Sequence, residues 1–378
     1  MPDRTPTPLP SILKHFKVDN AFDWYNTARP RILKMLAENE YGYIPPRPEA
    51  MKCELLREVR NLAGGTARRR EYGITLYNAG KKYYFEILLY SPEDVAKPVL
   101  AAVAALNFCG NAGVMEEDGS PFDENERKGK PGRWPIRQLM ESGFIVATAA
   151  RSDIYFDDTA PESRKNSIFG LFGDIDGNDR HFTAISAWAF GYRTICDFLL
   201  TLPEVDPKRI WFHGHSRLGK TALWAAANDP RAAGVVSNDS GCGGAAISRD
   251  KEGETLRKIV TRFPYWFVPE FDRYMDNEAA MPWDQHYLVS LSAPRPVLVA
   301  SASEDQWAYP PNEFRAAVAS GEVYKLFGVE GIAEGTAFPP PDTPILRKGV
   351  GYYMRTGIHG VFPYDWEQVA AFIRLNTP

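Results

Sequence analysis

The chain has few cysteines, and none has the spacing by which cysteines bind a metal. The four stand far apart in 378 residues without a C-x-x-C pair: Cys53, Cys109, Cys196 and Cys242. The six histidines form no H-E-x-x-H pattern either. We therefore expect no metal and no cofactor. The cysteine spacing leaves the disulfide state and the cellular compartment open.

Long apolar runs and excess positive charge are also missing. No stretch approaches the roughly 18 apolar residues of a membrane helix, so we expect no membrane span. The first residues lack a basic segment followed by an apolar one, so the chain is expected either to stay in the cell or to lack its export signal. A net charge of -4 argues against nucleic acid as a partner, because nucleic acid favours a basic face.

The sequence does contain enough apolar residues, 44%, for a large core. Prolines in residues 1–20 predict an extended leader, and residues 21–378 are expected to form a single domain. Residues 21–40 have helical periodicity, with Phe22, Tyr25, Ile32, Met35 and Leu36 on the apolar face. Residues 52–90 read as antiparallel strands, with an arginine triplet at 68–70 expected to be solvated.

After residue 98, continuous apolar runs predict strands that are buried on both faces. They span residues 99–106, 144–150, 234–237 and 297–302, and they alternate with helical stretches such as 182–200. This alternation predicts an α/β fold, a three-layer sandwich with a mostly parallel sheet and an antiparallel N-terminal part. Two long segments, 111–134 and 151–180, are expected to be functional loops. Within the second, the acidic cluster 174–179 reads as a turn, since it lacks the spacing of a calcium loop.

The stretch Trp211–Lys220 places Ser216 between a strand and a helix, where a serine nucleophile would be exposed. Gly214 allows the tight turn before the serine. The second glycine of the usual G-x-S-x-G pattern is displaced, because Leu218 holds its position and glycine follows at Gly219. The alternative is that Ser216 only caps the helix.

A serine hydrolase on such a sheet carries an acid and then a histidine after later strands. Two acids qualify, Asp239 after the strand at 234–237 and Asp305 after the strand at 297–302. His359 is the histidine that follows both acids and a late strand, whereas His286 precedes a helix and is expected to be structural. The presence of all three residue types in this order favours a nucleophilic Ser216.

Eight segments together resemble the bacterial branch of the glucuronoyl esterases, carbohydrate esterase family fifteen. The resemblance covers the chain from about Tyr41 to its end, and G-x-S-R-x-G-K is its most specific motif, with His215 where fungal members have cysteine. The segments are Gly214–Lys220, Ser237–Ala245, Gly253–Thr255, Phe263–Phe267, Asp284–His286, Ala293–Pro296, Asp305–Trp307 and Thr356–His359.

The resemblance implies an α/β-hydrolase that cleaves the ester between (4-O-methyl-)glucuronic acid side chains of glucuronoxylan and lignin alcohols. Ser216 would attack the carbonyl, His359 would transfer the proton, and an acid would orient the imidazole. Arg217 would stabilise the oxyanion. The substrate-binding residues would be Lys220, Glu254 and Trp307. By similarity we expect a secreted or periplasmic monomer.

The choice of acid stays open between two positions. Asp305 follows the penultimate strand in a D-x-W context found in bacterial relatives, whereas Asp239 stands where fungal relatives have glutamate. We favour Asp305, because the shorter side chain of Asp239 sets its carboxylate back from the imidazole.

Two other functions also stay open. One is a different carbohydrate esterase, such as a deacetylase, and the other is a non-catalytic carbohydrate-binding descendant. Retention of a nucleophile, a histidine and an acid argues against the second.

Overall fold

The computed structural model describes residues 6–94, 99–115, 133–173 and 182–377. Nine strands form one sheet in the order β1-β2-β3-β5-β4-β6-β7-β8-β9. The strands are β1 (Ala50–Asn61), β2 (Ala67–Asn78), β3 (Lys81–Pro92), β4 (Ala101–Asn107), β5 (Phe144–Ala150), β6 (Ile210–His215), β7 (Gly234–Asn238), β8 (Val297–Ala302) and β9 (Val350–Arg355).

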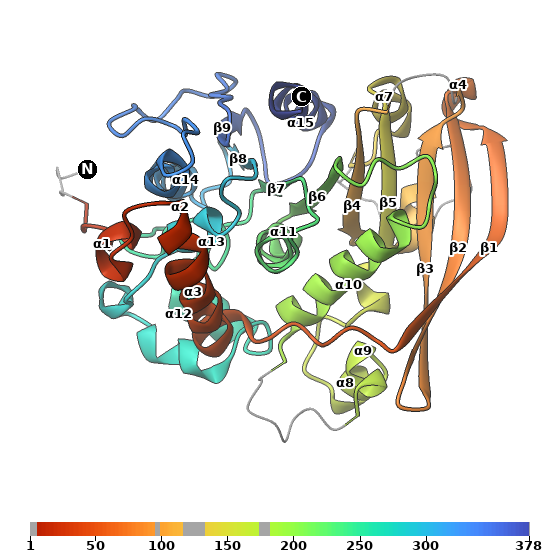
Figure 1. Cartoon of the computed structure of the whole chain (residues 1–378), viewed down its shortest axis with the longest axis horizontal. Helices are drawn as coiled ribbons and strands as arrows, with labels where there is room; N and C mark the ends of the chain where they lie inside the picture. The colour runs from red at the N-terminus through yellow and green to blue at the C-terminus, as the bar shows by residue number, and fades with distance from the viewer. Residues whose placement is uncertain (1–5, 95–98, 116–132, 174–181, 378) are drawn as a thin grey trace.

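The sheet has two parts of opposite character. Strands β1, β2 and β3 form an antiparallel ribbon that continues antiparallel onto β5, on the right of Figure 1. From β5 to β9 all neighbours are parallel. Strands β4, β5, β7 and β8 are buried along their whole length, as their continuous apolar runs predict. Strands β6 and β9 are also fully buried. Parallel pairing brings the ends of β6, β7, β8 and β9 to one edge.

Helices cover both faces of the parallel part. One core cluster joins the sheet to helices on the first face: α1 (Ile12–Phe16), α3 (Arg29–Leu36), α10 (Ala184–Leu199), α11 (Arg217–Asn228), α13 (His286–Ser290) and α14 (Pro310–Lys325). A second cluster joins it to α7 (Ile136–Glu141) and α15 (Pro363–Asn376) on the other face. The molecule is therefore the three-layer α/β sandwich that the sequence predicts.

The remaining helical elements are short and lie in the connections. They are α2 (Ala21–Asp23), η1 (Trp24–Ala28), η2 (Ala37–Tyr41), α4 (Leu62–Gly65), α5 (Gly110–Met115), η4 (Arg151–Asp153), α8 (Pro161–Lys165), α9 (Ile168–Leu171), α12 (Leu256–Arg262), η5 (Pro269–Tyr274) and η6 (Glu278–Ala280). Parts of the two long connections expected to be functional, 116–132 and 174–181, lie outside the described residues, and with them the acidic turn at 174–179.

The N-terminal segment differs from its expected conformation in two ways. Part of the leader is helical, because Ser11 caps α1 through its side chain. The helical region at 21–41 is present, but Phe22 and Tyr25 are exposed, 73% and 48%, while Trp24 is fully buried. Two π-helical segments, η1 and η2, flank α3 and change the helical repeat, so simple 3.6-residue periodicity selects the wrong aromatic residues.

The arginine triplet at 68–70 also differs from its expected exposure. Arg69 and Arg70 on β2 are buried and paired with Glu71 and Glu204. A run of charged residues is expected on the solvated surface, but such residues can be buried where carboxylates pair with them. The prediction for these two residues was therefore wrong.

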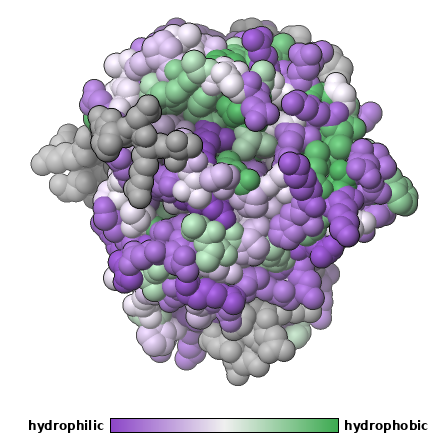
Figure 2. Space-filling view, turned by 90° about the vertical axis from the view of Figure 1, so that its left-hand side faces the viewer, coloured by the Kyte–Doolittle hydropathy of each residue, from purple (hydrophilic) through white to green (hydrophobic). Residues whose placement is uncertain are grey.

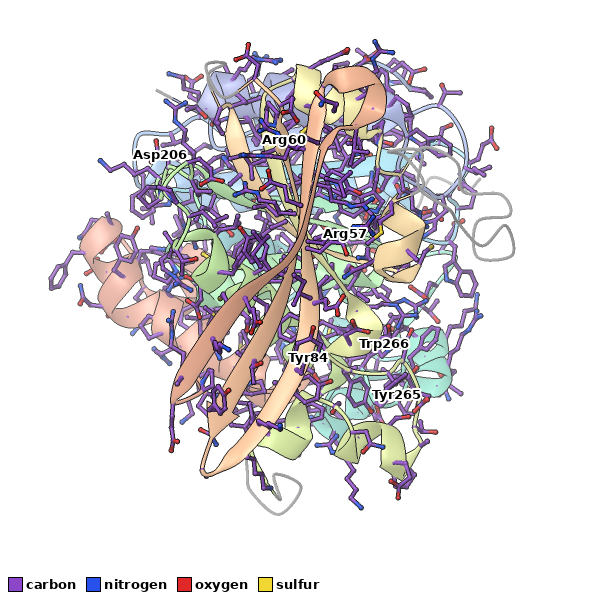
Figure 3. The ribbon with its side chains drawn as sticks, turned by 90° about the vertical axis from the view of Figure 1, so that its right-hand side faces the viewer. Arg57, Arg60, Tyr84, Asp206, Tyr265 and Trp266 are labelled. Atoms are coloured by element: carbon purple, nitrogen blue, oxygen red, sulfur yellow. The ribbon has the colours of Figure 1, made fainter. Side chains whose placement is uncertain are left out.

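The surface is mostly polar over the face that carries α1, α2 and α3, with small scattered apolar areas (Figure 2). Among the described residues, no helix is long and apolar enough to cross a membrane. None of the four cysteines, all of which lie among the described residues, forms a disulfide bond. The side with the antiparallel ribbon exposes charged residues such as Arg57 and Arg60 on β1 (Figure 3).

Candidate active site

Ser216 occupies a sharp turn between β6 and α11. Its backbone has φ 57° and ψ -129°, a strained conformation for a residue with a side chain. A Cβ atom at Gly214 would lie 1.9 Å from the carbonyl oxygen of Leu218, so glycine is required there. The Ser216 side chain makes no capping hydrogen bond to α11. The geometry is that of a nucleophile elbow rather than that of an ordinary helix cap.

The displaced second glycine has a packing explanation. A Cβ atom at Gly219 would lie 2.9 Å from the Ser240 Cβ atom and 3.2 Å from the Asn238 carbonyl oxygen. The Ser216 amide also donates to that carbonyl oxygen, at 2.8 Å. The first turn of α11 therefore packs directly against the turn after β7, and this contact requires glycine at 219.

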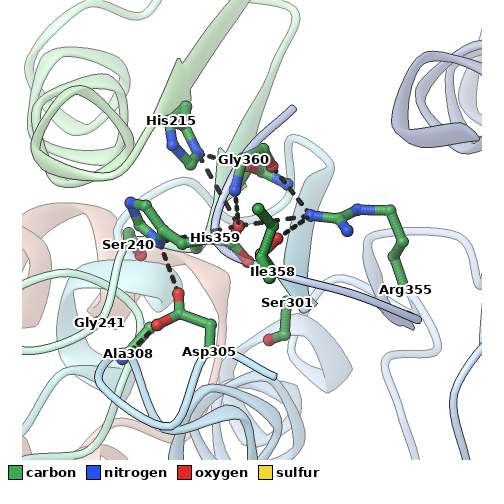
Figure 4. A network of polar contacts seen from close by, with 12 residues as sticks. His215, Ser240, Gly241, Ser301, Asp305, Ala308, Arg355, Ile358, His359 and Gly360 are labelled. Atoms are coloured by element: carbon green, nitrogen blue, oxygen red, sulfur yellow. Dashed lines mark hydrogen bonds and ion pairs between the residues drawn. The ribbon is translucent and has the colours of Figure 1, made fainter. Parts of the chain in front are cut away.

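His359 and Asp305 form a close pair at the ends of β9 and β8. The His359 Nδ1 atom lies 2.6 Å from the Asp305 Oδ2 atom, as Figure 4 shows, and the Ala308 amide donates to Oδ1 at 3.0 Å. Burial alone would raise the pKa of Asp305, but the hydrogen bond from His359 and its charge outweigh burial and hold the pKa below the ordinary value. An ionised Asp305 keeps the proton of His359 on Nδ1, which leaves Nε2 free to accept one.

The His359 ring also packs beside the elbow. Its centroid lies 4.4 Å from that of His215, the residue directly before Ser216. Burial first, and the neighbouring His359 second, lower the pKa of His215 well below the ordinary value. His215 therefore stays neutral and adds no positive charge next to His359.

Asp239 lies farther from the histidine than Asp305 does. Its Oδ2 atom is 3.9 Å from His359 Nδ1 and instead accepts from the Gly360 amide at 3.2 Å. Arg355 lies 3.8 Å away but bonds to Asp365. Burial, with negative charge on Glu313 and Asp305 as further causes, raises the pKa of Asp239 well above the ordinary value. The two candidate acids therefore differ in their distance from the histidine and in the direction in which their pKa values are shifted.

The Arg217 side chain lies among aromatic rings next to the elbow. Its guanidinium carbon is 4.6 Å from the centre of the Trp266 ring and 5.3 Å from that of Phe263. Its Nη1 atom contacts the Asp157 carboxylate. Burial, followed by repulsion from Arg151, lowers the pKa of Arg217 to about 10, so the side chain is charged at neutral pH.

The three residues expected to bind substrate are connected to one another. Lys220 Nζ lies 4.0 Å from Glu254 Oε2 and donates to the Ser240 carbonyl oxygen. Trp307 Nε1 donates to Glu254 Oε1 at 2.9 Å. Lys220 and Glu254 are buried, whereas the Trp307 ring is 45% exposed. An exposed aromatic ring fixed by a buried carboxylate is suited to stacking on a sugar.

Sequence reasoning missed several charged residues around the site. Asp157 contacts Arg217, and Lys251 donates to the carbonyl oxygens of Trp307 and Ala308. Glu313 on α14 accepts from the Gly241 amide and from Ser301. No motif marks these residues. The only available signal was that Asp157 falls in a long connection.

A cluster of possible metal ligands coincides with the two acids and the histidine. One donor atom each from Asp239, Asp305 and His359 lie within 4.8 Å of one another. The hydrogen bond from His359 to Asp305 and that from Gly360 to Asp239 already use these donor atoms. The arrangement is explained by hydrogen bonding within an acid and histidine site.

Comparisons with known proteins agree with this geometry. A sequence model described as "Glucuronyl esterase, fungi" matches residues 129–328. A carbohydrate esterase from an unknown prokaryotic organism is 34% identical over 374 residues, which cover 94% of this chain and 86% of that protein. A 4-O-methyl-glucuronoyl methylesterase of Schizophyllum commune is 26% identical, over 82% of this chain and 71% of its own length.

Solved structures extend the similarity to the whole chain. A glucuronoyl esterase from Solibacter usitatus superimposes with a TM-score of 0.88 at 34% identity, and the match covers 100% of both chains. A structure described as a promiscuous esterase of carbohydrate esterase family 15, from a marine bacterial metagenome, gives a TM-score of 0.86 at 33% identity, over 100% of this chain and 98% of that one. The expected α/β-hydrolase fold is thereby confirmed, and the chain belongs to the glucuronoyl esterase family.

Proposed function

We propose that this protein is a serine esterase that hydrolyses the ester between (4-O-methyl-)glucuronic acid side chains of glucuronoxylan and lignin alcohols. Water is added across the ester bond, and the products are a uronate anion, a proton and the free alcohol. The observation that carries the proposal is the strained Ser216 elbow beside the hydrogen-bonded pair of His359 and Asp305. Family membership supplies the substrate class.

In this proposal Ser216 is the nucleophile and His359 is the general base. His359 Nε2 accepts the Ser216 proton as the hydroxyl oxygen attacks the ester carbonyl, and the proton then passes to the leaving alcohol. Water next attacks the acyl-enzyme, with the same histidine accepting its proton. Asp305 holds the imidazole in the required tautomer and stabilises its positive charge.

Two observations support Asp305 rather than Asp239 as the orienting acid. The distance from His359 Nδ1 is 2.6 Å to Asp305 and 3.9 Å to Asp239, and only the first is a hydrogen-bond distance. The pKa of Asp305 is lowered and that of Asp239 is raised, so the surroundings favour the charged form more at Asp305 than at Asp239. We assign Asp239 a supporting role through the Gly360 amide.

The positive groups beside the elbow have separate proposed roles. The backbone amide of Arg217 begins α11 and would donate to the oxyanion, with the guanidinium adding fixed charge. Lys220 and Glu254 would bind sugar hydroxyls, and Trp307 would form the wall of the sugar site. The bonds of Glu254 to Trp307 and Lys220 support a single recognition surface.

The polymer substrate also bears on location and assembly. Glucuronoxylan esterified to lignin is part of an insoluble wall, so we place the enzyme outside the cytoplasm, secreted or periplasmic. One chain carries the whole proposed triad, and we propose a monomer. Light scattering after gel filtration would test the monomer, because a mass twice that of the 42.4 kDa chain would contradict it.

The decisive experiment compares methyl and benzyl esters of glucuronic acid with an aryl acetate. We expect kcat/KM to be highest on the glucuronate esters, and Ser216→Ala to remove all three activities. Preference for acetate would favour a general or promiscuous esterase, the activity named in the description of the marine relative. No turnover of any ester by the wild type would favour a binding protein.

A further inference from the structure

The guanidinium of Arg217 lies in an environment that holds it without fixing its orientation. Three aromatic rings surround it, at 4.6 Å for Trp266, 5.3 Å for Phe263 and 5.9 Å for Phe108, measured from the guanidinium carbon to each ring centre. Cation–π attraction favours this position but tolerates rotation about the side-chain bonds. Its buried Nε atom has no hydrogen-bond partner among the described residues. A second contact is needed to orient the group.

Asp157 supplies that contact from the connection after β5. Its Oδ2 atom accepts from Nη1 of Arg217 and lies 3.2 Å from Nη1 of Arg151. Its Oδ1 atom accepts from the Tyr265 hydroxyl at 3.0 Å and from Trp266 Nε1 at 2.8 Å. The side chain is only 9% exposed. Donors from three segments therefore fix the carboxylate, and the carboxylate in turn fixes Arg217.

Tyr265 and Trp266 orient the contact between Asp157 and Arg217. Both belong to the turn after α12 and lie close together in Figure 3. Trp266 stacks on Phe263 with 3.9 Å between ring centres, and its indole nitrogen donates to Asp157 while its face covers Arg217. One ring therefore holds both members of the pair, so the carboxylate and the guanidinium cannot shift independently.

The charge balance around Asp157 is equally specific. Arg151 and Arg217 are both largely buried, and repulsion from Arg151 contributes to the lowered pKa of Arg217. Without Asp157, two guanidinium groups would face each other with no negative charge between them. Lys220 has a matching neighbour in Glu254, at 4.0 Å. Arg217 thus shares the Asp157 carboxylate with Arg151, and Lys220 has Glu254 as its neighbour.

The pairing of positive groups with carboxylates affects how strongly an esterase binds a product that is an anion. The substrate ester is neutral, and a uronate product carries a negative charge that unpaired Arg217 and Lys220 would retain. A carboxylate paired with the guanidinium weakens product binding. The brief negative charge of the transition state still meets donors that are already oriented.

We propose that Asp157 is a positioning residue for Arg217: it orients the guanidinium at the site of the oxyanion and offsets its charge so that the uronate product is released. This inference rests on the proposed function for its substrate. Asp157 has no direct contact with the reacting atoms in the proposal and acts through Arg217.

A double-mutant cycle tests the orienting role. Asp157→Asn keeps the shape and can still accept from Tyr265 and Trp266, but its amide group repels the guanidinium. We expect kcat on methyl glucuronate to fall about tenfold, with KM little changed, and to fall by less than twofold when Arg217 is already alanine. Equal losses in both backgrounds would show that Asp157 does not act through Arg217.

Asp158→Asn is the matched control. This neighbouring carboxylate is exposed, and within the part of the chain that the structure describes it accepts from the Ala160 amide and the Ser163 hydroxyl of its own loop, each at 3.0 Å. Its kinetics should equal those of the wild type. If Asp157→Asn does not fold, Tyr265→Phe replaces it, since that change removes one donor to Asp157 without a change in charge. A loss of kcat that also depends on Arg217 is expected there, and independence from Arg217 would refute the proposal.

Product inhibition tests the charge balance. D-glucuronate should inhibit Asp157→Asn about threefold more strongly than the wild type, and added salt should reduce the difference. A distorted site would bind the product more weakly, so unchanged or weaker inhibition contradicts this role. If the wild type hydrolyses only the aryl acetate, the proposed function fails. The cycle on acetate still measures the coupling between Asp157 and Arg217, because its oxyanion needs the same donors.

Discussion

The turns after β7 and β8 are neighbours, and each carries one of the two candidate acids. The surroundings of these acids shift their pKa values in opposite directions. Asp305 after β8 receives a hydrogen bond from His359, and its pKa is lowered. Asp239 after β7 accepts from the Gly360 amide, leaves Oδ1 without a partner among the described residues, and has a raised pKa. The pKa values of identical side chains at adjacent strand ends are thus shifted in opposite directions because their neighbours differ.

The turns also differ in the other proposed roles that they carry. The turn after β8 continues into Trp307, whose ring is exposed, so in our proposal catalysis and sugar recognition share one short segment. The turn after β7 contacts the elbow through Ser240 and Gly219, and the Ser240 carbonyl oxygen accepts from Lys220. One turn would thus face the substrate, and the other packs against the elbow that carries Ser216.

The largest expected effect comes from removal of the proposed nucleophile, Ser216, which both turns surround. Ser216→Ala should reduce kcat on the order of 10⁶-fold, because the acyl-enzyme cannot form. Ser237→Ala on β7 is the control, since this buried serine has a hydroxyl without a partner among the described residues, and near wild-type activity is expected. Substantial turnover by Ser216→Ala would move the active site away from these turns.

The different roles proposed for Asp305 and Asp239 are tested by replacing each of them with asparagine. Asp305→Asn should lower kcat on the order of 10⁴-fold, because an amide partner favours the wrong histidine tautomer. Asp239→Asn should cost less than about tenfold, since Asp239 lies 3.9 Å from His359 Nδ1, too far for a hydrogen bond, and an amide oxygen can still accept from the Gly360 amide. If steady-state kinetics showed the large loss of kcat in Asp239→Asn instead, Asp239 and not Asp305 would be the orienting acid.

A smaller effect separates the two turns by substrate. Trp307→Ala should lower kcat/KM on methyl glucuronate about tenfold or more, and leave an aryl acetate nearly unaffected, because only the sugar uses the ring. Lys220→Met and Glu254→Gln should show the same selectivity. If kcat/KM fell equally on both substrates, these residues would contribute to folding instead of to sugar recognition.

The smallest expected effect is on stability. The pKa of Asp239 is raised on folding, so its stabilising contribution is present below the ordinary pKa of 3.8 and is lost as pH rises towards the folded value. Asp239→Asn should therefore gain stability relative to the wild type as pH rises above 3.8, as measured by urea unfolding at a series of pH values. Asp305 has the opposite sign, because its lowered pKa gives stability above 3.8 that is lost in acid. A flat difference across pH for Asp239→Asn would mean that Asp239 is ionised.

Local sequence patterns were sufficient for much of the fold. The apolar runs at 144–150 and 297–302 predict β5 and β8 with their observed bounds, because strands buried on both faces need continuous apolar residues. The same reasoning failed for Phe22, Tyr25, Arg69 and Arg70. The exposure of Phe22 and Tyr25 follows from the π-helical segments. Arg70 pairs with Glu204, which is distant in the sequence, whereas the partner of Arg69, Glu71, stands two residues along the same strand.

The elbow, the order of serine, acids and histidine, and the family are determined by the sequence itself, because turn glycines and motif spacing are local properties. Which acid bonds to the histidine is decided by the tertiary structure, because it depends on a distance of 2.6 Å against 3.9 Å to one imidazole. For Asp157 the sequence held no signal beyond its place in a long connection. Its partners Arg151, Arg217, Tyr265 and Trp266 come from three segments, and only the packing of the sheet and its connections brings them to one carboxylate.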